Sequence, residues 1–414
     1  MEEWKEYKYT DLCTLIGGGT PKTSEPSYWG GDIPWLSVKD FGNDEKYVYS
    51  TEKTITEAGL NNSSTKLLRR DDIIISARGT IGAIAMLASE MAFNQSCFGI
   101  RSNDIVEQHY LYYLTKTKIS ELQKNSHGSV FDTITRDTFA KIDCVIPSKK
   151  IQRQIASILS SLDDKIEVNR KINENLEQQA QALFNSWFVD FEPFKNGEFV
   201  ESELGMIPKG WREVELQDVV TIKRGGSPRP IQNFLSLSGY HWLKISDATA
   251  CQSPYIYEIR EYIKESGLSK TVKLRAGSLV LSNSATPGIP KILGVDSCIH
   301  DGWLYFPQSK LSKYYLYMLF KEKREFLLSQ GNGSVFTNLK TDIVKSMKIA
   351  IPNEQILSKF NSLIESLFIQ IENKTIESRR LATLRDTLLP KLMSGELRVQ
   401  DTDLINEMLE KGIR

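Results

Sequence analysis

Short hydrophobic runs make up most of two stretches of the chain. The runs at 72–76, 140–147 and 278–282 are apolar and rich in β-branched residues, and Gly, Pro, Asn and Ser residues separate such runs. Runs of this length and composition are typical of β-strands. The segments that begin at Tyr110 and Tyr315 are instead predicted to form one short helix each. We therefore expect compact modules with a mostly β core and a few short helices.

A different pattern follows Pro147 and Pro352. There, apolar residues recur every three or four positions, which is the spacing of one apolar stripe along an α-helix. A helix of about 39 residues would be about 58 Å long, too long for one module to bury its stripe. Each helix therefore needs a partner, and the order of the segments along the chain makes the two helices antiparallel. Ser148 and Asn353 stand where a helix N-cap belongs.

An internal repeat relates the two halves of the chain. The offset between matched residues falls from 207 to 205 along the chain. The matched segments are Trp4 with Trp211, 18–21 (GGTP) with 225–228 (GGSP), 35–36 with 242–243 (both WL), 73–76 with 279–282, and 128–131 with 333–336 (both GSVF). A drift of two residues indicates small loop insertions on one shared fold. Asn169 and Lys374 interrupt the two helical stripes at equivalent points, a common device for fixing helix register.

These patterns predict an α+β fold with two repeated modules and two long antiparallel coiled-coil helices, related by a pseudo-two-fold axis. The expected divisions are 1–147 (module one), 148–207 (first long helix and linker), 208–352 (module two) and 353–414 (second long helix and C-terminal tail). In this arrangement the helix pair separates two equal modules.

Composition narrows the class of protein. With 40% hydrophobic and 25% charged residues the chain is typical of a globular protein, and no apolar run approaches the roughly 18 residues of a membrane span. The charged start of the chain lacks the apolar core of a signal peptide, so we expect a cytoplasmic location and no membrane partner. The five cysteines and four histidines are widely scattered, which predicts buried thiols and no metal site.

Catalytic motifs are missing from the sequence. It contains no Gly-Lys dipeptide and hence no phosphate loop, and it contains neither a GxGxxG turn nor a GxSxG elbow. The residues that match between the modules are mainly Trp, Gly, Pro, Ser and apolar residues, which specify a fold, whereas the polar tips differ. Segments 18–21 and 225–228 fit either a tight turn or an anion-binding nest. We therefore interpret the modules as two recognition modules that share one scaffold and bind different sequences.

Charge separates the two modules. Module one carries four more acidic than basic residues, whereas module two carries eight more basic than acidic residues. An excess of Lys and Arg is the electrostatic footprint of a phosphate-binding face. Module one would have to concentrate Lys66, Arg69, Arg70 and Arg78 on one side to bind DNA in the same way.

Several motifs together resemble one family over essentially the whole chain. They are the Gly-Gly-Thr/Ser-Pro turns, the two Trp-Leu steps, 78–82 (RGTIG), Asn94-Gln95, the two Gly-Ser-Val-Phe segments, 207–211 (IPKGW) and 389–397 (LPKLMSGEL). In these motifs the chain is similar to the specificity subunits of type I restriction-modification systems. It departs from the repeat at 282–288, where module two has SNSATPG instead of the Arg-Gly loop of module one.

The resemblance implies a non-catalytic subunit with two target-recognition domains, each gripping one half of a bipartite, asymmetric site in double-stranded DNA. It also implies docking of two methyltransferase subunits that hold S-adenosylmethionine, and of restriction subunits that use ATP and Mg²⁺, so that this chain itself carries no cofactor. Two alternatives stay open: a nuclease or methyltransferase in its own right, and a helical scaffold with protein- or glycan-binding modules.

Candidate contact residues follow from the modules and from this resemblance. The residues predicted to contact DNA are Lys22, Lys39, Arg69, Arg70, Arg78, Thr80, Asn94, Gln95, Ser129, Arg224, Arg229, Lys244, Asn283, Ser284, Ser334, Thr337 and Lys340. Arg78 fits a guanine reader or, alternatively, a surface ion pair. Trp187, Phe188 and Phe191 are predicted to bind the methyltransferase subunits, with packing against module two as the alternative.

Overall fold

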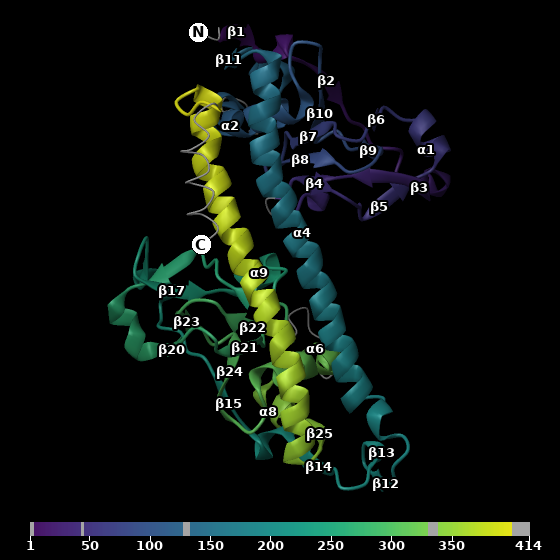
Figure 1. Ribbon diagram of the computed structural model, residues 1–414, viewed down its shortest axis with the longest axis vertical. Helices are drawn as coiled ribbons and strands as arrows, with labels where there is room; N and C mark the ends of the chain where they lie inside the picture. The colour runs from purple at the N-terminus through teal and green to yellow at the C-terminus, as the bar shows by residue number, and fades with distance from the viewer. Residues whose placement is uncertain (1–3, 43–44, 127–132, 330–337, 400–414) are drawn as a thin grey trace. The chain divides into compact units, whose positions relative to one another are not determined.

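The computed structural model describes residues 4–42, 45–126, 133–329 and 338–399 (Figure 1). The chain folds into two compact units. Unit 1 consists of Met1–Val168 and Glu377–Arg414, and unit 2 of Asn169–Ile376. Each long helix contributes one half to each unit, so the compact units cut across the four segments expected from the sequence.

Unit 1 contains two β-sheets and a separate strand pair. The five-stranded sheet has the order β2-β10-β7-β8-β4, the four-stranded sheet has the order β5-β3-β9-β6, and β1 pairs with β11. The strands are β1 (Lys5–Lys8), β2 (Cys13–Gly17), β3 (Trp29–Leu36), β4 (Tyr47–Val48), β5 (Lys53–Ile55), β6 (Leu67–Leu68), β7 (Ile73–Ser76), β8 (Ile84–Leu87), β9 (Met91–Phe93), β10 (Cys97–Ser102) and β11 (Asp143–Ile146). Neighbouring strands are antiparallel, except that β3 is parallel to β9 and β4 is parallel to β8.

Unit 2 repeats this plan. Its first sheet has the order β15-β24-β21-β22-β18, its second has the order β16-β19-β17-β23-β20, and β14 pairs with β25. The strands are β12 (Phe199–Ser202), β13 (Gly205–Pro208), β14 (Arg212–Glu215), β15 (Val220–Arg224), β16 (Leu235–Ser236), β17 (Tyr240–Leu243), β18 (Tyr255–Ile256), β19 (Glu261–Ile263), β20 (Val272–Leu274), β21 (Leu279–Ser282), β22 (Pro290–Leu293), β23 (Ser297–Ile299), β24 (Trp303–Ser309) and β25 (Lys348–Ile351). The edge strand β16 and the hairpin β12–β13 are additions to the shared plan.

Several of the helices also correspond between the units. They are α1 (Glu57–Asn61), α2 (Gln108–Ser126), α3 (Arg136–Ala140) and α4 (Lys149–Phe188), then α5 (Ile245–Ala250), α6 (Lys313–Glu322), α7 (Arg324–Ser329), α8 (Thr341–Lys345) and α9 (Glu354–Ser394). Short 3-10 turns lie at Tyr9–Asp11, Pro26–Tyr28, Val38–Asp40, Glu192–Phe194, Leu216–Asp218, Ile231–Asn233 and Glu265–Lys270. The helices expected from Tyr110 and Tyr315 are α2 and α6.

The central strands are apolar throughout because both of their faces are buried. In β7, Ile73 and Ile75 belong to the core against the helices, whereas Ile74 lies in the smaller core between the two sheets. In β21, Leu279 and Leu281 face the helices and Val280 faces the second sheet. Successive side chains of a strand point to opposite faces, so a run such as Ile-Ile-Ile is what a strand buried on both faces needs.

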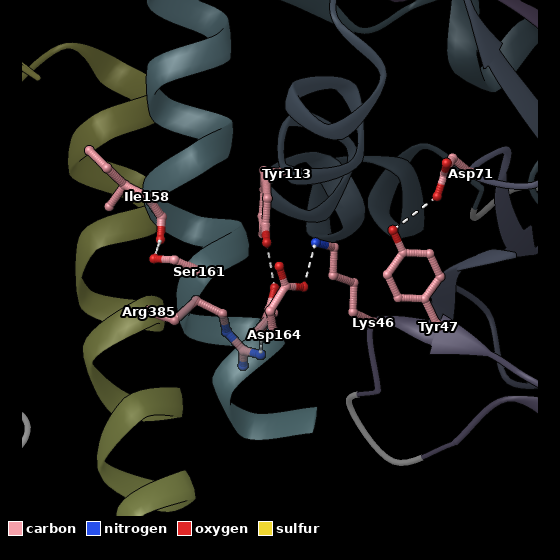
Figure 2. Close-up of polar contacts among 9 residues, drawn as sticks. Lys46, Tyr47, Asp71, Tyr113, Ile158, Ser161, Asp164 and Arg385 are labelled. Carbon is pink, nitrogen blue, oxygen red and sulfur yellow. Dashed lines mark hydrogen bonds and ion pairs between the residues drawn. The ribbon is translucent and has the colours of Figure 1, made fainter. Parts of the chain in front are cut away.

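The two long helices run antiparallel in each unit. In unit 1, Arg385 of α9 donates to Asp163 of α4 at 2.7 Å, and Lys165 of α4 lies 3.8 Å from Glu377 of α9. Residue numbers therefore rise along one helix as they fall along the other. Figure 2 shows Arg385 between the two helices and Tyr113 near it. The Tyr113 hydroxyl of α2 donates to the other oxygen of the Asp163 carboxylate. In unit 2, Asn173 of α4 donates to Thr375 of α9 at 3.1 Å.

The fold class expected from the sequence is confirmed: α+β, with two repeated modules of mostly β core and two long antiparallel helices of 40 and 41 residues. Asn353 is an N-cap, because its side chain accepts a hydrogen bond from the Ile356 amide at 3.0 Å. The second helix passes through Pro390 and ends at Ser394, where Gly395 follows with a φ of 75°. The pseudo-two-fold axis, which concerns the relative placement of the units, stays a prediction.

The cysteines are free thiols, four of them buried and Cys251 half-buried. Burial raises the pKa of both the Cys13 and the Cys97 thiols to about 12, so neither is a thiolate near neutral pH. Among the described residues, no cluster of three or more His, Cys, Asp and Glu side chains could hold a metal ion. No helix in the described ranges is both long and apolar enough to cross a membrane.

Candidate DNA interface

Strand register brings most of the predicted DNA contacts to one end of each module. In module one, β10 pairs Phe98 with Gly17 of β2 and Cys97 with Ser76 of β7, so β2 and β7 end together. The amide of Asn94, just after β9, donates to the carbonyl of Leu36 at the end of β3. We call the end at which β2, β3, β7 and β9 stop the loop edge of module one. The corresponding end of β15, β17, β21 and β23 is the loop edge of module two.

The predicted residues divide clearly by this edge. Those on or next to the loop edges are Lys22, Lys39, Arg78, Thr80, Asn94 and Gln95 in module one, and Arg224, Arg229, Lys244, Asn283, Ser284 and Lys340 in module two. Arg69 and Arg70 instead precede β7 and so lie at its other end from Arg78. The structure therefore does not concentrate these three arginines at one site. Ser129, Ser334 and Thr337 lie outside the described residues.

The loop after β7 is anchored by the same hydrogen bonds as the loop after β21. In module one, the Ser76 hydroxyl donates to the carbonyl of Thr80 and accepts from the amide of Ala83 at 2.9 Å. In module two, the Ser282 hydroxyl donates to the carbonyl of Thr286 at 2.7 Å and accepts from the amide of Ile289 at 2.8 Å. The two loops thus share these anchoring hydrogen bonds while their sequences differ.

The tip of this loop differs between the modules. Arg78 is exposed and, within the described part of the chain, forms no hydrogen bond or ion pair, so the surface ion pair considered for it is not found there. Gly79 follows with a φ of 79°, and the matching Ala285 has a φ of 57°. Positive φ is uncommon for a residue with a Cβ, which fits a loop whose shape is imposed by its hydrogen bonds. Ser284 takes the place of Arg78.

The prediction that Asn283 contacts DNA does not fit the structure. The residue is only 3% exposed, and its backbone bonds to Gly302 and to Leu339 on either side. Leu339 follows the second Gly-Ser-Val-Phe segment, so the returning chain covers this position. The neighbouring Ser284 is half-buried and remains available at the tip.

The Gly-Gly turns are tight turns rather than anion nests. A Cβ on Gly18 would lie 2.1 Å from the carbonyl oxygen of Asn94, and a Cβ on Gly225 would lie 2.2 Å from that of His300. The amide of Gly19 already donates to Phe93, at 2.9 Å, and that of Gly225 already donates to Trp303. Glycine is required because two backbones touch, and these amides have no free hydrogen for an anion.

In both modules the Gly-Gly turn also bonds to the loop that follows a parallel strand, β9 in module one and β23 in module two. Thr20 donates to the Gln95 side chain in module one, and Ser227 donates to Asp301 in module two at 2.6 Å. The pair His300-Asp301 is therefore the structural counterpart of Asn94-Gln95. The sequence prediction missed it, although the 206-residue offset places the two pairs on one another.

Module two surrounds this pair with charge. Its loop edge holds a hollow of about 710 Å³, lined by Ser227, Pro228, Arg229, Pro230, Ile231, Leu235, Trp242, Lys244, Glu261, His300 and Asp301. The hydrogen bond from Ser227 lowers the pKa of the Asp301 carboxyl, and burial lowers the pKa of His300. Asp301 is therefore ionised and His300 is neutral at physiological pH. Lys244 forms an ion pair with Glu261.

The aromatic residues at the end of α4 belong to a cluster within unit 2. The Phe188 ring lies 4.9 Å from Tyr315 and 4.7 Å from Phe360, and Phe191 lies 5.3 Å from Trp211. These contacts correspond to the packing alternative of the sequence interpretation. Trp187, Phe188 and Phe191 are nevertheless only half-buried, so part of each ring reaches the surface.

Comparison with known proteins assigns the family. The family model described as "Type I restriction modification DNA specificity domain" matches residues 1–178 and 208–378. The MjaIX specificity subunit of Methanocaldococcus jannaschii is 33% identical over 97% of this chain and 95% of its own length. The HindI specificity subunit of Haemophilus influenzae is 24% identical over 96% of this chain and all of its own length.

One solved structure agrees in fold. The S subunit of a type I restriction-modification system from M. genitalium matches 94% of this chain and 96% of its own chain, with a TM-score of 0.55 and 14% identity. The family match falls on the two modules and on parts of both long helices, the segments that the internal repeat duplicates. The chain belongs to the specificity subunits of type I restriction-modification systems.

Proposed function

We propose that each module reads one half of a bipartite, asymmetric site in double-stranded DNA through its loop edge. The observation that carries this proposal is the pair of loops that share their anchoring hydrogen bonds but carry different side chains at their tips, Arg78 in one and Ser284 in the other. A shared scaffold fixes the position of a reader, and the side chain at that position selects the base. Two different tips give two different half-sites.

The different net charges of the modules favour different proportions of phosphate contacts and base contacts. Module two has an excess of eight basic residues, which favours phosphate contacts. Module one has a net negative charge, and its loop edge offers Lys22, Lys39 and Arg78 as exposed cations. Module one therefore depends more on base contacts and less on counterion release than module two does.

In the assembly that we propose, two methyltransferase subunits bind the long helices and supply S-adenosylmethionine for adenine methylation. Restriction subunits supply ATP-dependent, Mg²⁺-dependent cleavage, while this chain supplies recognition and carries no cofactor. The exposed parts of Trp187, Phe188 and Phe191 form part of the methyltransferase contact. The complex would work in the cytoplasm, where the cell's DNA is accessible to it.

Sequencing of methylated adenines tests the main proposal. Cells that contain the chain and its methyltransferase subunits should methylate one bipartite motif, and removal of the chain should abolish that methylation. Exchange of module two for that of another specificity subunit should change one half of the motif only. A methylated motif that persists without the chain would contradict the proposal, as would cleavage or methylation of DNA by the purified chain alone.

A further inference from the structure

One carboxylate at the loop edge of module two holds three side chains. Asp301 accepts a hydrogen bond from Ser227 at 2.6 Å, and its Oδ2 lies 3.4 Å from a guanidinium nitrogen of Arg229. A nitrogen of Arg224 lies 3.9 Å from the same Oδ2, while Nε of Arg224 donates to the backbone carbonyl of Asp301. The two guanidinium groups are thus drawn to one point.

Module one has no such arrangement. At the matching positions it carries Gly17 for Arg224, Lys22 for Arg229 and Gln95 for Asp301. Among the described residues of module one, the bond from the turn, between Thr20 and Gln95, is the part that is kept. Stability of the turn therefore requires an acceptor at this position, but it requires neither a charge nor two arginines. The charged cluster is an addition specific to module two.

The two arginines remain accessible. Their side chains are 54% and 80% exposed, and that of Asp301 is 39% exposed. A guanidinium has five N–H donors in a planar fork, so contact with one carboxylate oxygen leaves most of them free. A side chain that is already held in place loses less rotamer freedom when it binds, which makes each new hydrogen bond more effective.

The chemistry of the cluster complements a G·C base pair. In the major groove, guanine presents the acceptors O6 and N7, which match an arginine fork, and cytosine presents the N4 amino donor, which matches a carboxylate. A phosphate offers acceptors only, and the negative charge of Asp301 at the same point opposes its approach. Pro228, Leu235 and the ring of Trp242 add apolar surface to the lining of the hollow.

We propose that Asp301 positions Arg224 and Arg229 as readers of a G·C pair in the half-site of module two, and itself accepts from the cytosine of that pair. This inference rests on the proposed function, because it assumes that the loop edge faces DNA. Asp301 thus has two roles in this proposal: it positions the two arginines, which make the guanine contact, and it contacts the cytosine itself.

The test uses a library of randomised duplexes bound by the full-length chain together with methyltransferase subunits. The variants are Asp301→Asn, which keeps the shape and the acceptor for Ser227, and Arg229→Lys, which keeps the charge but loses the fork. The control is Asp296→Asn. Asp296 immediately precedes β23 and Asp301 closely follows it, so the control removes the same charge at the opposite end of one strand.

The wild-type chain should select a bipartite motif with a fixed G·C pair in one half. Asp301→Asn and Arg229→Lys should each weaken the preference for that pair, by roughly 5- to 150-fold for loss of the bidentate contact, the equivalent of about 1–3 kcal/mol. All other positions and the thermal unfolding midpoint should stay unchanged. Asp296→Asn should leave the motif as it is.

Three results would overturn the inference. One is an unchanged base preference in both variants, and another is an equal change in Asp296→Asn. The third is a uniform loss of affinity with a weaker salt dependence, which would make the arginines phosphate contacts. If the wild-type chain selects no motif at all, the proposed function fails as well, so the two failures are distinguishable.

Discussion

Arg385 and Asp163 form an ion pair in the interior of unit 1, with only 2% and 3% of their side chains exposed. The Tyr113 hydroxyl donates to the second carboxylate oxygen of Asp163, and burial raises the pKa of Tyr113, so that it stays a donor (Figure 2). The pair joins the two long helices, since Asp163 belongs to α4 and Arg385 to α9.

The matching positions of unit 2 are apolar. With the 205-residue offset, Tyr113, Asp163 and Arg385 correspond to Met318, Phe368 and Ala180. Met318, Phe368 and Ala180 are all fully buried in the core of unit 2. One duplicated helix contact is thus polar in one unit and apolar in the other. A buried polar contact is a known means of fixing helix register, and here it distinguishes two otherwise similar contacts.

Removal of one member of the pair should be costly. Arg385→Ala leaves the Asp163 carboxylate buried without its partner, and we expect a loss of about 3–5 kcal/mol in the free energy of unfolding of unit 1. The triple change Tyr113→Met, Asp163→Phe and Arg385→Ala copies unit 2 and should recover most of that loss. Urea unfolding of the full-length chain measures both.

The control for this prediction is Lys165→Ala. It removes the more exposed ion pair with Glu377 on the same two helices, and we expect a change of about 0–1 kcal/mol. A triple variant that is no more stable than Arg385→Ala would show that unit 1 depends on the polar contact itself.

Base reading by module one is tested at the tip of the loop after β7. Arg78→Ser installs the residue of module two and leaves Ser76 and Gly82, which shape the loop, untouched. Loss of a bidentate guanine contact should relax one position of one half-site by about 1–3 kcal/mol. Selection from randomised duplexes reads the preference at every position. If affinity fell equally for all sequences, Arg78 would be a phosphate contact.

Strand register explains which parts of the site could be predicted from the sequence. The repeat was sufficient for the fold, because two copies that share Gly, Trp and apolar positions share one core. It could not tell that Arg69 and Arg78 lie at opposite ends of β7, since this depends on where a four-residue strand begins and ends. The burial of Asn283 depends on a contact with Leu339, 56 positions away, which no local pattern records.

The counterparts of Asn94 and Gln95 could have been found earlier. The offset alone pairs them with His300 and Asp301, but the residue types differ, so a comparison of identities passes over them. Their equivalence becomes plain only through the shared hydrogen bond from Thr20 and Ser227. A base-contacting position whose residue type differs between the modules is not found when the two copies are compared for identical residues.

Two residues of the aromatic cluster of unit 2 test two different roles, and Phe188 tests the packing role. Phe188 contacts Tyr315, Phe360 and Trp211, so Phe188→Ala should lower the free energy of unfolding of unit 2 by about 2–4 kcal/mol. Thermal unfolding of the free chain measures this change. An unfolding midpoint equal to that of the wild type would mean that the cluster contributes little to packing.

Trp187 tests docking of the methyltransferase subunits. Its ring packs on Phe360 at 5.8 Å and on Phe194 at 6.0 Å, but it stays partly exposed. Trp187→Asp places a charge on this surface and should weaken binding of methyltransferase subunits by about tenfold or more, since large aromatic residues often dominate interfaces. Light scattering of the mixture gives affinity and stoichiometry. Undiminished binding, with the chain still folded, would remove Trp187 from the interface.

The long helices should set the gap between the two half-sites. Asn173 of α4 contacts Thr375 of α9, so insertions after Lys171 and after Ile376 fall at facing positions of the antiparallel pair. One heptad in each helix keeps both apolar stripes in phase and lengthens each helix by about 10 Å at 1.5 Å per residue. DNA rises about 3.4 Å per base pair, so the preferred gap should grow by up to about three base pairs. Tilt of the helices against the DNA would make the increase smaller. Both half-site sequences should stay the same, because neither loop edge is altered.

Sequencing of methylated adenines in cells with the variant gives the gap and both half-sites together. The control is a heptad in α4 alone, since it breaks the match between the helices and should abolish methylation. An active double-insertion variant that keeps the original gap would mean that the helices do not determine the spacing.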